Sequence, residues 1–272
     1  MCKKLTSILS YFWSKKRVMK QLKAVIFDVD GTLAETERDG HRVAFNKAFK
    51  EHQLDWYWNE ALYGELLAVT GGKERIKYYL SDFHTDFEFA GDRTELIKEL
   101  HASKTKHYIA LLENKAIELR PGVLRLINEL RSSDLRMAIA TTTTPQNVTA
   151  LINSTLGEHA LEWFDYIAAG DIVPAKKPAP DIFTHCLEKL DLDAGECIAF
   201  EDSGNGVKSS VSAGIKTIVT LNDYTKGDDF SGAVSVFNHL GETDLPCEYI
   251  AGKNIDDSVI TIDVLKGLHA QA

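Results

Sequence analysis

The chain has 272 residues, of which 44% are hydrophobic and 26% are charged, and its formal net charge is −9. This composition is typical of a globular protein with a sizeable core, built as one elaborate domain or two. The acidic balance argues against a nucleic-acid-binding protein, and no apolar run approaches the roughly 20 residues of a membrane-spanning helix, so neither nucleic acid nor membrane is an expected partner.

Residues 1–21 are basic around a short apolar centre, Leu5 to Trp13, and no small-residue cleavage site follows them. We interpret them as an N-terminal extension. The four cysteines have neither metal-binding nor disulfide-type spacing, which favours reduced thiols and a cytoplasmic protein. If the extension is instead a targeting segment, an organelle such as a plastid is the alternative location.

The apolar run at residues 24–27 predicts a strand that is covered on both faces of a parallel sheet. Two acids, Asp28 and Asp30, follow it before a Gly-Thr turn. Residues two apart in an extended chain share a face, so the two carboxylates would meet at the end of the strand, where like charges oppose joint ionisation. The pattern therefore requires a cation at this point.

The stretch between Thr36 and Pro121 is far longer than a usual strand-to-helix connection, and its pattern is helical throughout. It predicts an inserted antiparallel helical bundle. Its candidate helices are residues 41–52, 59–69, 73–83, 95–100 and 104–114. The expected domains are the extension 1–21, a core made of 22–37 and 117–272, and the inserted domain 38–116. Hinges are expected near 36–38 and 116–120.

After the insertion, helical and strand patterns alternate. The predicted helices are residues 121–134, 145–156, 180–190 and 204–214. The predicted strands are residues 136–142, 165–170, 197–202 and 216–221. This alternation predicts an α/β fold, a doubly wound parallel sheet with helices on both faces.

In such a sheet, ligands bind outside the carboxyl ends of the strands. The polar residues that follow the predicted strands are Asp28, Asp30, Thr141, Thr142, Thr143, Lys176, Lys177, Glu201 and Asp202. Oxygen ligands without histidine or cysteine favour Mg²⁺. The set predicts phosphoryl transfer through an aspartyl-phosphate, with Mg²⁺ held by Asp28, Asp202 and a backbone carbonyl.

In this scheme Asp28 attacks phosphorus and Lys177 neutralises the charge on the phosphoryl oxygens. Asp30 protonates the leaving oxygen and later deprotonates a water molecule. Within the run of threonines, Thr141 is the expected inward hydroxyl because it ends the strand, with Thr143 second.

Simpler interpretations exist for each of these residues. Asp28 and Asp30 could form a solvated turn, and Glu201 and Asp202 could cap the helix that follows them. The joint occurrence of all the strand-end residues favours the catalytic interpretation over these alternatives.

Four stretches resemble the motifs of the haloacid dehalogenase superfamily of phosphotransferases, in the same order. They are DVDGT, the strand-ending Thr141, Lys177 in AKKPAPDIF, and FEDS at 200–203. The resemblance implies Asp28 as nucleophile and Asp30 as acid/base and carbonyl metal ligand. It implies Asp202 as metal ligand, Glu201 as a metal ligand through water, Thr141 as a phosphate hydrogen-bond donor and Lys177 as charge stabiliser. The helical insertion resembles a type-1 cap of that superfamily.

A closer resemblance is to the CbbY-type phosphatases and covers roughly residues 22–238. It is carried by LAETERDGHRVAFNKAF, TGGKERI, RPGV, ATTTTPQNV, AAGDIV and AKKPAPDI. These enzymes convert xylulose-1,5-bisphosphate to xylulose 5-phosphate, so the resemblance implies a small phosphorylated sugar as substrate. This sequence departs from the bacterial members at His41, which lies eleven residues after Asp30. The bacterial spacing is one residue shorter, and the spacing in this chain resembles that of the plant-type sequence.

A bisphosphate needs cations on the cap that face the core, with guanidinium preferred. The candidates are Lys73 and Arg75, which follow the glycines Gly71 and Gly72 at a helix start. A solvated helix face is the alternative for both. Further candidate substrate-binding residues are Glu35, His41, Arg42, Thr142 and Thr143.

Two other functions remain open from the sequence. A β-phosphoglucomutase-like phosphosugar mutase would share every core residue. A signalling receiver domain uses a similar set of acid, threonine and lysine, but is expected near 120 residues without an inserted bundle. Because the site lies between cap and core, a monomer suffices for the chemistry.

Overall fold

A computed structural model describes residues 20–114 and 117–271 of the chain, and at its centre lies a seven-stranded sheet in the order β3-β2-β1-β4-β5-β6-β7. The strands are β1 (Ala24–Phe27), β2 (Arg136–Thr141), β3 (Tyr166–Ala169), β4 (Cys197–Glu201), β5 (Lys216–Thr220), β6 (Ser235–Phe237) and β7 (Tyr249–Gly252). Strands β1 to β6 run parallel, and β7 pairs antiparallel with β6. The predicted parallel α/β sheet is confirmed.

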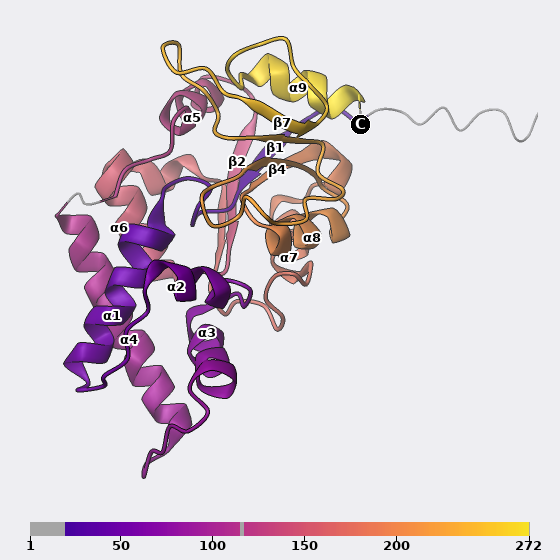
Figure 1. The fold of residues 1–272 in the computed structure, drawn as a ribbon. Coiled ribbons are helices and arrows are strands. Elements are labelled where there is room, and N and C mark those ends of the chain that lie inside the picture. Colours follow the sequence, from indigo (N-terminus) through magenta and orange to yellow (C-terminus); the bar gives the residue numbers. More distant parts are fainter. Residues whose placement is uncertain (1–19, 115–116, 272) are drawn as a thin grey trace, which may run out of the picture.

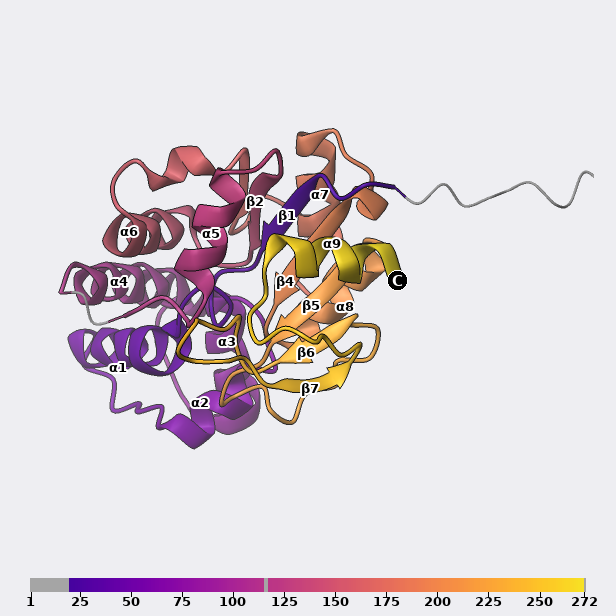
Figure 2. The same ribbon diagram turned by 90° about the horizontal axis from the view of Figure 1, so that it is seen from above.

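Helices cover both faces of this sheet (Figures 1 and 2). They are α5 (Val123–Arg131), α6 (Pro145–Leu156), α7 (Asp181–Leu190), α8 (Gly204–Ser212) and α9 (Ile262–Gln271). Because side chains alternate along a strand, Val25 and Phe27 pack in one core cluster with residues of α5, α6 and α9. Ala24 and Ile26 pack on the other face, against α7.

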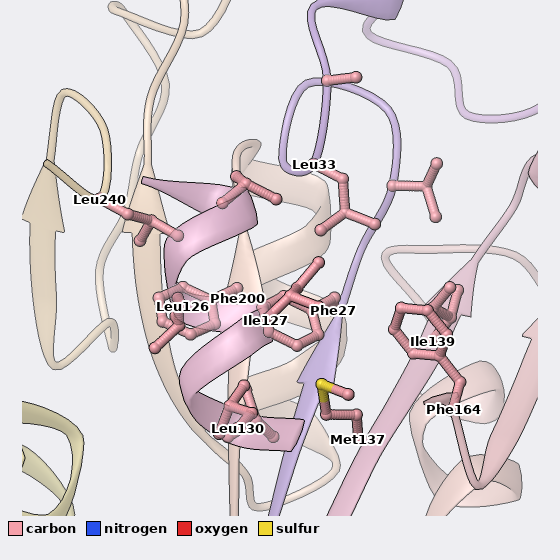
Figure 3. Packing of buried hydrophobic residues seen from close by; sticks show 14 of the residues in the cluster. Phe27, Leu33, Leu126, Ile127, Leu130, Met137, Ile139, Phe164, Phe200 and Leu240 are labelled. Carbon is pink, nitrogen blue, oxygen red and sulfur yellow. The ribbon is translucent and has the colours of Figure 1, made fainter. Parts of the chain in front are cut away.

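Large side chains fill the first of these faces, as Figure 3 shows. Phe27 and Phe200, from neighbouring strands, stack with their ring centroids 5.3 Å apart. Leu126, Ile127 and Leu130 of α5 cover them, because spacings of three and four residues place them on one side of the helix. This packing fixes the ends of β1 and β4, where the candidate site residues begin.

The segment between β1 and α5 is helical, as predicted. It contains α1 (Arg42–Glu51), α2 (Glu60–Leu66), α3 (Gly72–Tyr78) and α4 (Arg93–Glu113), with π-helical turns at Glu37–His41 and Tyr79–Phe83. The bundle has its own aromatic core, in which the rings of Phe45 and Trp58 lie 4.7 Å apart. Helices α1 and α4 lie side by side (Figures 1 and 2).

One detail of the predicted bundle was wrong. Residues 95–100 and 104–113 belong to one helix, α4, and not to two, and Asn114 follows its end. The intervening sequence His101-Ala102-Ser103 contains neither glycine nor proline, and Ser103 is buried, so nothing breaks the helix there.

Three elements outside the bundle, β6, β7 and α9, were not predicted. Of these, β6 has three residues, which are too few alternating positions to give a strand pattern.

Two neighbouring chain segments, residues 33–34 and 119–120, connect the inserted helices to the sheet. Ala34 forms an isolated bridge with Leu119, and the N–H of Arg120 donates to the carbonyl oxygen of Leu33 at 2.9 Å. The buried Arg120 guanidinium donates to the carbonyl oxygens of Gly31, Thr220, Leu221 and Asn238. Arg120 therefore ties the start of the insertion to the ends of β5 and β6.

Residues 1–19 of the predicted extension and residue 116 of the predicted second hinge lie outside the described residues. Within residues 20–114 and 117–271, none of the helices combines the length and the apolar character that crossing a membrane requires.

Candidate active site

A cavity of about 410 Å³ lies at the carboxyl ends of β1, β2 and β4. The predicted residues that line it are Asp28, Asp30, Arg75, Thr141, Thr142, Lys177, Glu201 and Asp202. Its opposite wall comes from the inserted helices and includes Gly64 and Glu65 of α2. The structure thus brings the strand-end residues together, beneath α2.

Lys177 places a positive charge beside Asp28, the first of the two acids that follow β1. Its Nζ donates to Oδ1 of Asp28 at 2.5 Å, to Oε1 of Glu201 at 2.6 Å and to the carbonyl oxygen of Ala140 at 2.9 Å. Burial alone would lower the pKa of Lys177, but the charges of Asp28 and Glu201 outweigh it and hold this pKa above its ordinary value. Lys177 is therefore charged at neutral pH.

One lysine does not balance three carboxylates. Oxygen atoms of Asp28, Glu201 and Asp202 lie within 4.8 Å of one another, and all three residues are buried. Burial raises the pKa of Asp28 and Asp202 above the usual range and that of Glu201 to about 8. Oε2 of Glu201 has no hydrogen-bond partner among the described residues. This all-oxygen donor set fits a hard divalent cation.

Asp30 belongs to a separate chain of contacts. Its Oδ1 accepts a hydrogen bond from Oγ1 of Thr36 at 2.6 Å and lies 2.9 Å from Nε2 of His41. Nδ1 of the same ring lies 2.9 Å from Nζ of Lys104 on α4. Burial would raise the pKa of Asp30, but His41 and then Thr36 outweigh it and hold this pKa well below its ordinary value. His41 thus lies between Asp30 and Lys104.

The threonines at the end of β2 differ in position. Thr141 and Thr142 line the main cavity, whereas Thr142 and Thr143 line a neighbouring cavity of about 50 Å³. Oγ1 of Thr141 accepts from the N–H of Thr143 at 3.3 Å, and Oγ1 of Thr143 accepts from Asn147 at 3.1 Å. Thr141 therefore lies at the main cavity together with Thr142, whereas Thr143, the second candidate, lines only the smaller cavity.

The smaller cavity lies between α3 and the loop after β3 and is lined by four cationic side chains, Lys73, Arg75, Lys104 and Lys176. Lys73 pairs with Asp171 at 2.5 Å, and Lys176 pairs with Asp171 at 2.9 Å and with Glu74 at 3.0 Å. We call Lys73, Glu74, Asp171 and Lys176 the bridging ion-pair cluster, because it joins α3 to the sheet side of the molecule.

Arg75 lines both cavities and is buried. Its Nη1 donates to the hydroxyl of Tyr63 at 2.7 Å and lies 3.5 Å from Oε2 of Glu37, to which that hydroxyl donates at 2.5 Å. Nε of Arg75 has no hydrogen-bond partner among the described residues. The Arg75 guanidinium is therefore held through Nη1, while its Nε–H group is free to donate to a ligand.

Two predicted residues lie away from both cavities. Glu35 is half exposed and pairs with Nε of Arg120 at 2.9 Å. Nε of Arg42 donates to the carbonyl oxygen of Arg38 at 3.1 Å. Their roles in substrate binding stay predictions.

Sequence reasoning missed several residues that line the two cavities, among them Glu37, Lys104 and Asn222. Asn222 follows the end of β5, so the strand-end rule could have identified it. Glu37 and Lys104 lie on helical turns and carried no sequence signal.

The comparison with protein families decides the assignment. Residues 22–214 match the family model described as a haloacid dehalogenase-like hydrolase, a range that includes every strand-end residue that the sequence predicted, from Asp28 to Asp202. Protein CbbY of Rhodobacter capsulatus is 47% identical over 78% of this chain and 91% of its own length. The chain belongs to the haloacid dehalogenase-like hydrolases, and within them to the CbbY-type proteins. The predicted phosphatase is confirmed at this level, and the receiver-domain alternative is wrong.

Solved structures agree with this family. A crystal structure of a CbbY mutant from Rhodobacter sphaeroides in complex with xylulose-(1,5)bisphosphate has a TM-score of 0.75 and 41% identity, covering 82% of this chain and 98% of that one. A β-phosphoglucomutase structure from Clostridium difficile has a TM-score of 0.68, covering 92% of this chain and 97% of that one. Its sequence identity is 18%, so that likeness concerns the fold alone.

Proposed function

We propose that the protein is a Mg²⁺-dependent phosphatase that hydrolyses a sugar bisphosphate, xylulose-1,5-bisphosphate, to xylulose 5-phosphate through an aspartyl-phosphate. The observation that carries the proposal is the placement of Asp28, 2.5 Å from Lys177, in a cavity roofed by α2. A CbbY protein that is 41% identical was solved with this bisphosphate, which supports the choice of substrate.

In the first step an oxygen of Asp28 forms a bond to phosphorus while the bond from phosphorus to the sugar oxygen breaks. Lys177 stabilises the charge on the phosphoryl oxygens, and the hydroxyl of Thr141 donates to one of them. Asp30 gives its proton to the departing sugar oxygen. Entry of an anionic phosphate beside Asp30 favours the protonated carboxyl that this step needs.

In the second step a water molecule attacks the phosphorus of the aspartyl-phosphate. Asp30, now ionised, takes a proton from that water, and the bond between phosphorus and Asp28 breaks to release inorganic phosphate. The contact of Asp30 with His41 favours its ionised form at this stage. Closure by the inserted helices would exclude water during the first step and readmit it for the second.

The group held by Asp28, Asp202 and the carbonyl of Asp30, with Glu201 acting through water, is proposed to be Mg²⁺. When bound, it neutralises negative charge on the phosphoryl oxygens. The carboxylates of this chain supply hard oxygen ligands, and the described residues place neither histidine nor cysteine in that cluster.

The remaining phosphate of the substrate is proposed to bind the cationic side chains of the smaller cavity. Arg75 is the strongest candidate, since it reaches both cavities and its Nε is free of partners among the described residues. Lys73, His41, Thr142 and Thr143 surround the same space. Lys73 is held by Asp171, so a phosphate would have to compete with that carboxylate.

We infer that residues 38–116 form a cap over a core made of 22–37 and 117–272. All the residues invoked above come from one chain, which supports a catalytically sufficient monomer. We retain the cytoplasmic location as a proposal.

The test compares two substrates and one metal treatment. We expect rapid release of phosphate from xylulose-1,5-bisphosphate, little from xylulose 5-phosphate, and no isomer from β-glucose 1-phosphate. Chelation should abolish turnover and Mg²⁺ should restore it. Formation of glucose 6-phosphate from β-glucose 1-phosphate would instead support the mutase alternative, which the low identity to the mutase structure does not favour.

A further inference from the structure

Asp202 accepts a hydrogen bond from Asn222, the second residue after the end of β5. Nδ2 of Asn222 donates to Oδ2 of Asp202 at 2.7 Å, and both side chains are buried. The amide therefore occupies one acceptor position of this carboxylate and fixes its rotation, while leaving its other oxygen unconstrained by this bond.

The orientation of the Asn222 amide is fixed by its own loop. The N–H of Tyr224 donates to Oδ1 of Asn222 at 2.9 Å, so the amide nitrogen is the atom that faces Asp202. The N–H of Asn222 donates to Oγ1 of Thr225 at 3.0 Å, and the N–H of Thr225 donates to the carbonyl oxygen of Asn222 at 3.1 Å. Residues 222–225 thus form a closed turn around one side chain.

The loop that carries Asp28 and Asp30 packs against this contact. Gly31, with φ of +81°, has no room for a side chain, because a Cβ there would clash with both Asp202 and Nδ2 of Asn222. The loop that carries the acids after β1 therefore packs directly against the contact between Asn222 and the acid after β4.

The same turn also contacts the inserted helices. The ring of Tyr224 meets that of Tyr63 edge to face at 6.0 Å, and a Cβ at Gly64 of α2 would lie 3.1 Å from Tyr224. The Tyr224 hydroxyl is buried with no hydrogen-bond partner among the described residues. The contact with α2 therefore depends on the ring and not on the hydroxyl.

We propose that Asn222 is a positioning residue that orients Asp202 for its divalent cation, and that Tyr224 holds the 222–225 turn in place by packing on α2. The proposal rests on the proposed function only in taking Asp202 as a metal ligand. Partners that orient a ligating side chain typically contribute 10–100-fold to metal affinity.

The test is calorimetric titration of the full chain with Mg²⁺ and no substrate. We expect Asn222→Ala and the size-matched Asn222→Leu to bind Mg²⁺ about 10–100-fold more weakly. Tyr224→Ala should weaken binding by a smaller factor, and Tyr224→Phe should match the parent because it keeps the ring. Asn205→Ala is the control, since Asn205 lines the same cavity but donates to the carbonyl oxygen of Ala68.

Steady-state kinetics add a second readout. If Asn222 acts through the metal, saturating Mg²⁺ should restore most of kcat in the Asn222 variants, whereas general damage to the fold would not be repaired. Parent-like Mg²⁺ affinity in both Asn222 variants would overturn this inference and leave the proposed function intact. If those variants do not fold, parent-like affinity in Tyr224→Ala would overturn the role of the turn. Failure of the parent itself to bind Mg²⁺ would refute the metal assignment, and this inference with it.

Discussion

Nζ of Lys104 lies 2.9 Å from Nδ1 of His41, whose other ring nitrogen lies 2.9 Å from Oδ1 of Asp30. The three residues come from α4, from the π-helical turn before α1 and from the loop after β1. An ammonium group has donors only, so Nδ1 of His41 accepts and its Nε2–H donates to Asp30. A buried lysine of the inserted helices is thereby linked, through one ring, to Asp30.

Lys104 provides a test based on pH. Burial lowers the pKa of Lys104 from its ordinary 10.5 to about 8. Between these values the unfolded chain binds a proton that the folded chain does not, so the free energy of unfolding gains a contribution that rises with pH across this window. Lys104→Met lacks that contribution. Its free energy of unfolding relative to the parent should therefore be highest below pH 8 and decline as the pH approaches 10.

Urea denaturation of both proteins at pH 7.5 and pH 10 measures this difference. Lys106→Met, an exposed site on the same helix, is the control and should show no such change. A Lys104→Met difference that stays constant with pH would contradict the assignment of a depressed lysine pKa.

Asp28→Asn tests the nucleophile. The amide cannot form the aspartyl-phosphate, so phosphate release should fall by at least about 10³-fold. Removing one of three neighbouring buried carboxylates relieves repulsion, so the variant should fold and still bind the sugar bisphosphate. Asp86→Asn changes an exposed acid and is the matched control. Turnover near the parent value in Asp28→Asn would exclude covalent catalysis at this residue.

Lys177→Met tests charge balance in the site. It leaves Asp28 and Glu201 buried without their cation, which should lower the free energy of unfolding at neutral pH by about 3–5 kcal/mol. Because Mg²⁺ would supply positive charge to the same carboxylates, the loss should be smaller when the metal is present. Chemical denaturation with and without Mg²⁺ measures both values. An equal loss under the two conditions would show that the metal and Lys177 do not share these partners.

The sheet and the cluster of side chains at its strand ends were predictable because they follow from a repeated pattern. Apolar runs such as residues 24–27 fix the strands, and parallel strands place their carboxyl ends at one edge. Residues far apart in the chain, such as Asp28, Lys177 and Asp202, then meet without any further information. The rule even covers Asn222, which follows β5 but has an ordinary amide that gave no reason to select it.

The inserted helices were less predictable, because a helical pattern does not say which side of the bundle meets the core. Glu35 is half exposed and pairs with Arg120, whereas Glu37, two residues later, lines both cavities. Glu37 begins a π-helical turn that ends at His41, and no sequence pattern indicated that turn. Lys104 is similar to any other helical lysine until α4 is packed against α1.

We predict that the bridging ion-pair cluster helps to attach α3 to the loop after β3. Hydrogen bonds from Lys73 and Lys176 lower the pKa of Asp171 to about 2, so this carboxylate is charged throughout the neutral range. Asp171→Asn removes two ion pairs at once. Since the Asp171 side chain is more than half exposed, we expect a loss of only about 1 kcal/mol, or roughly a fivefold shift towards an open arrangement.

Small-angle scattering of the full chain at low and high salt measures that shift. The parent should expand as salt screens the cluster, whereas Asp171→Asn should be more expanded at low salt and change less. Asp165→Asn, which removes an exposed ion pair with Arg136 that does not involve the inserted helices, is the control and should scatter like the parent. Superimposable low-salt profiles for the parent and Asp171→Asn would mean that packing contacts, such as Tyr224 on Tyr63, hold the inserted helices without help from these charges.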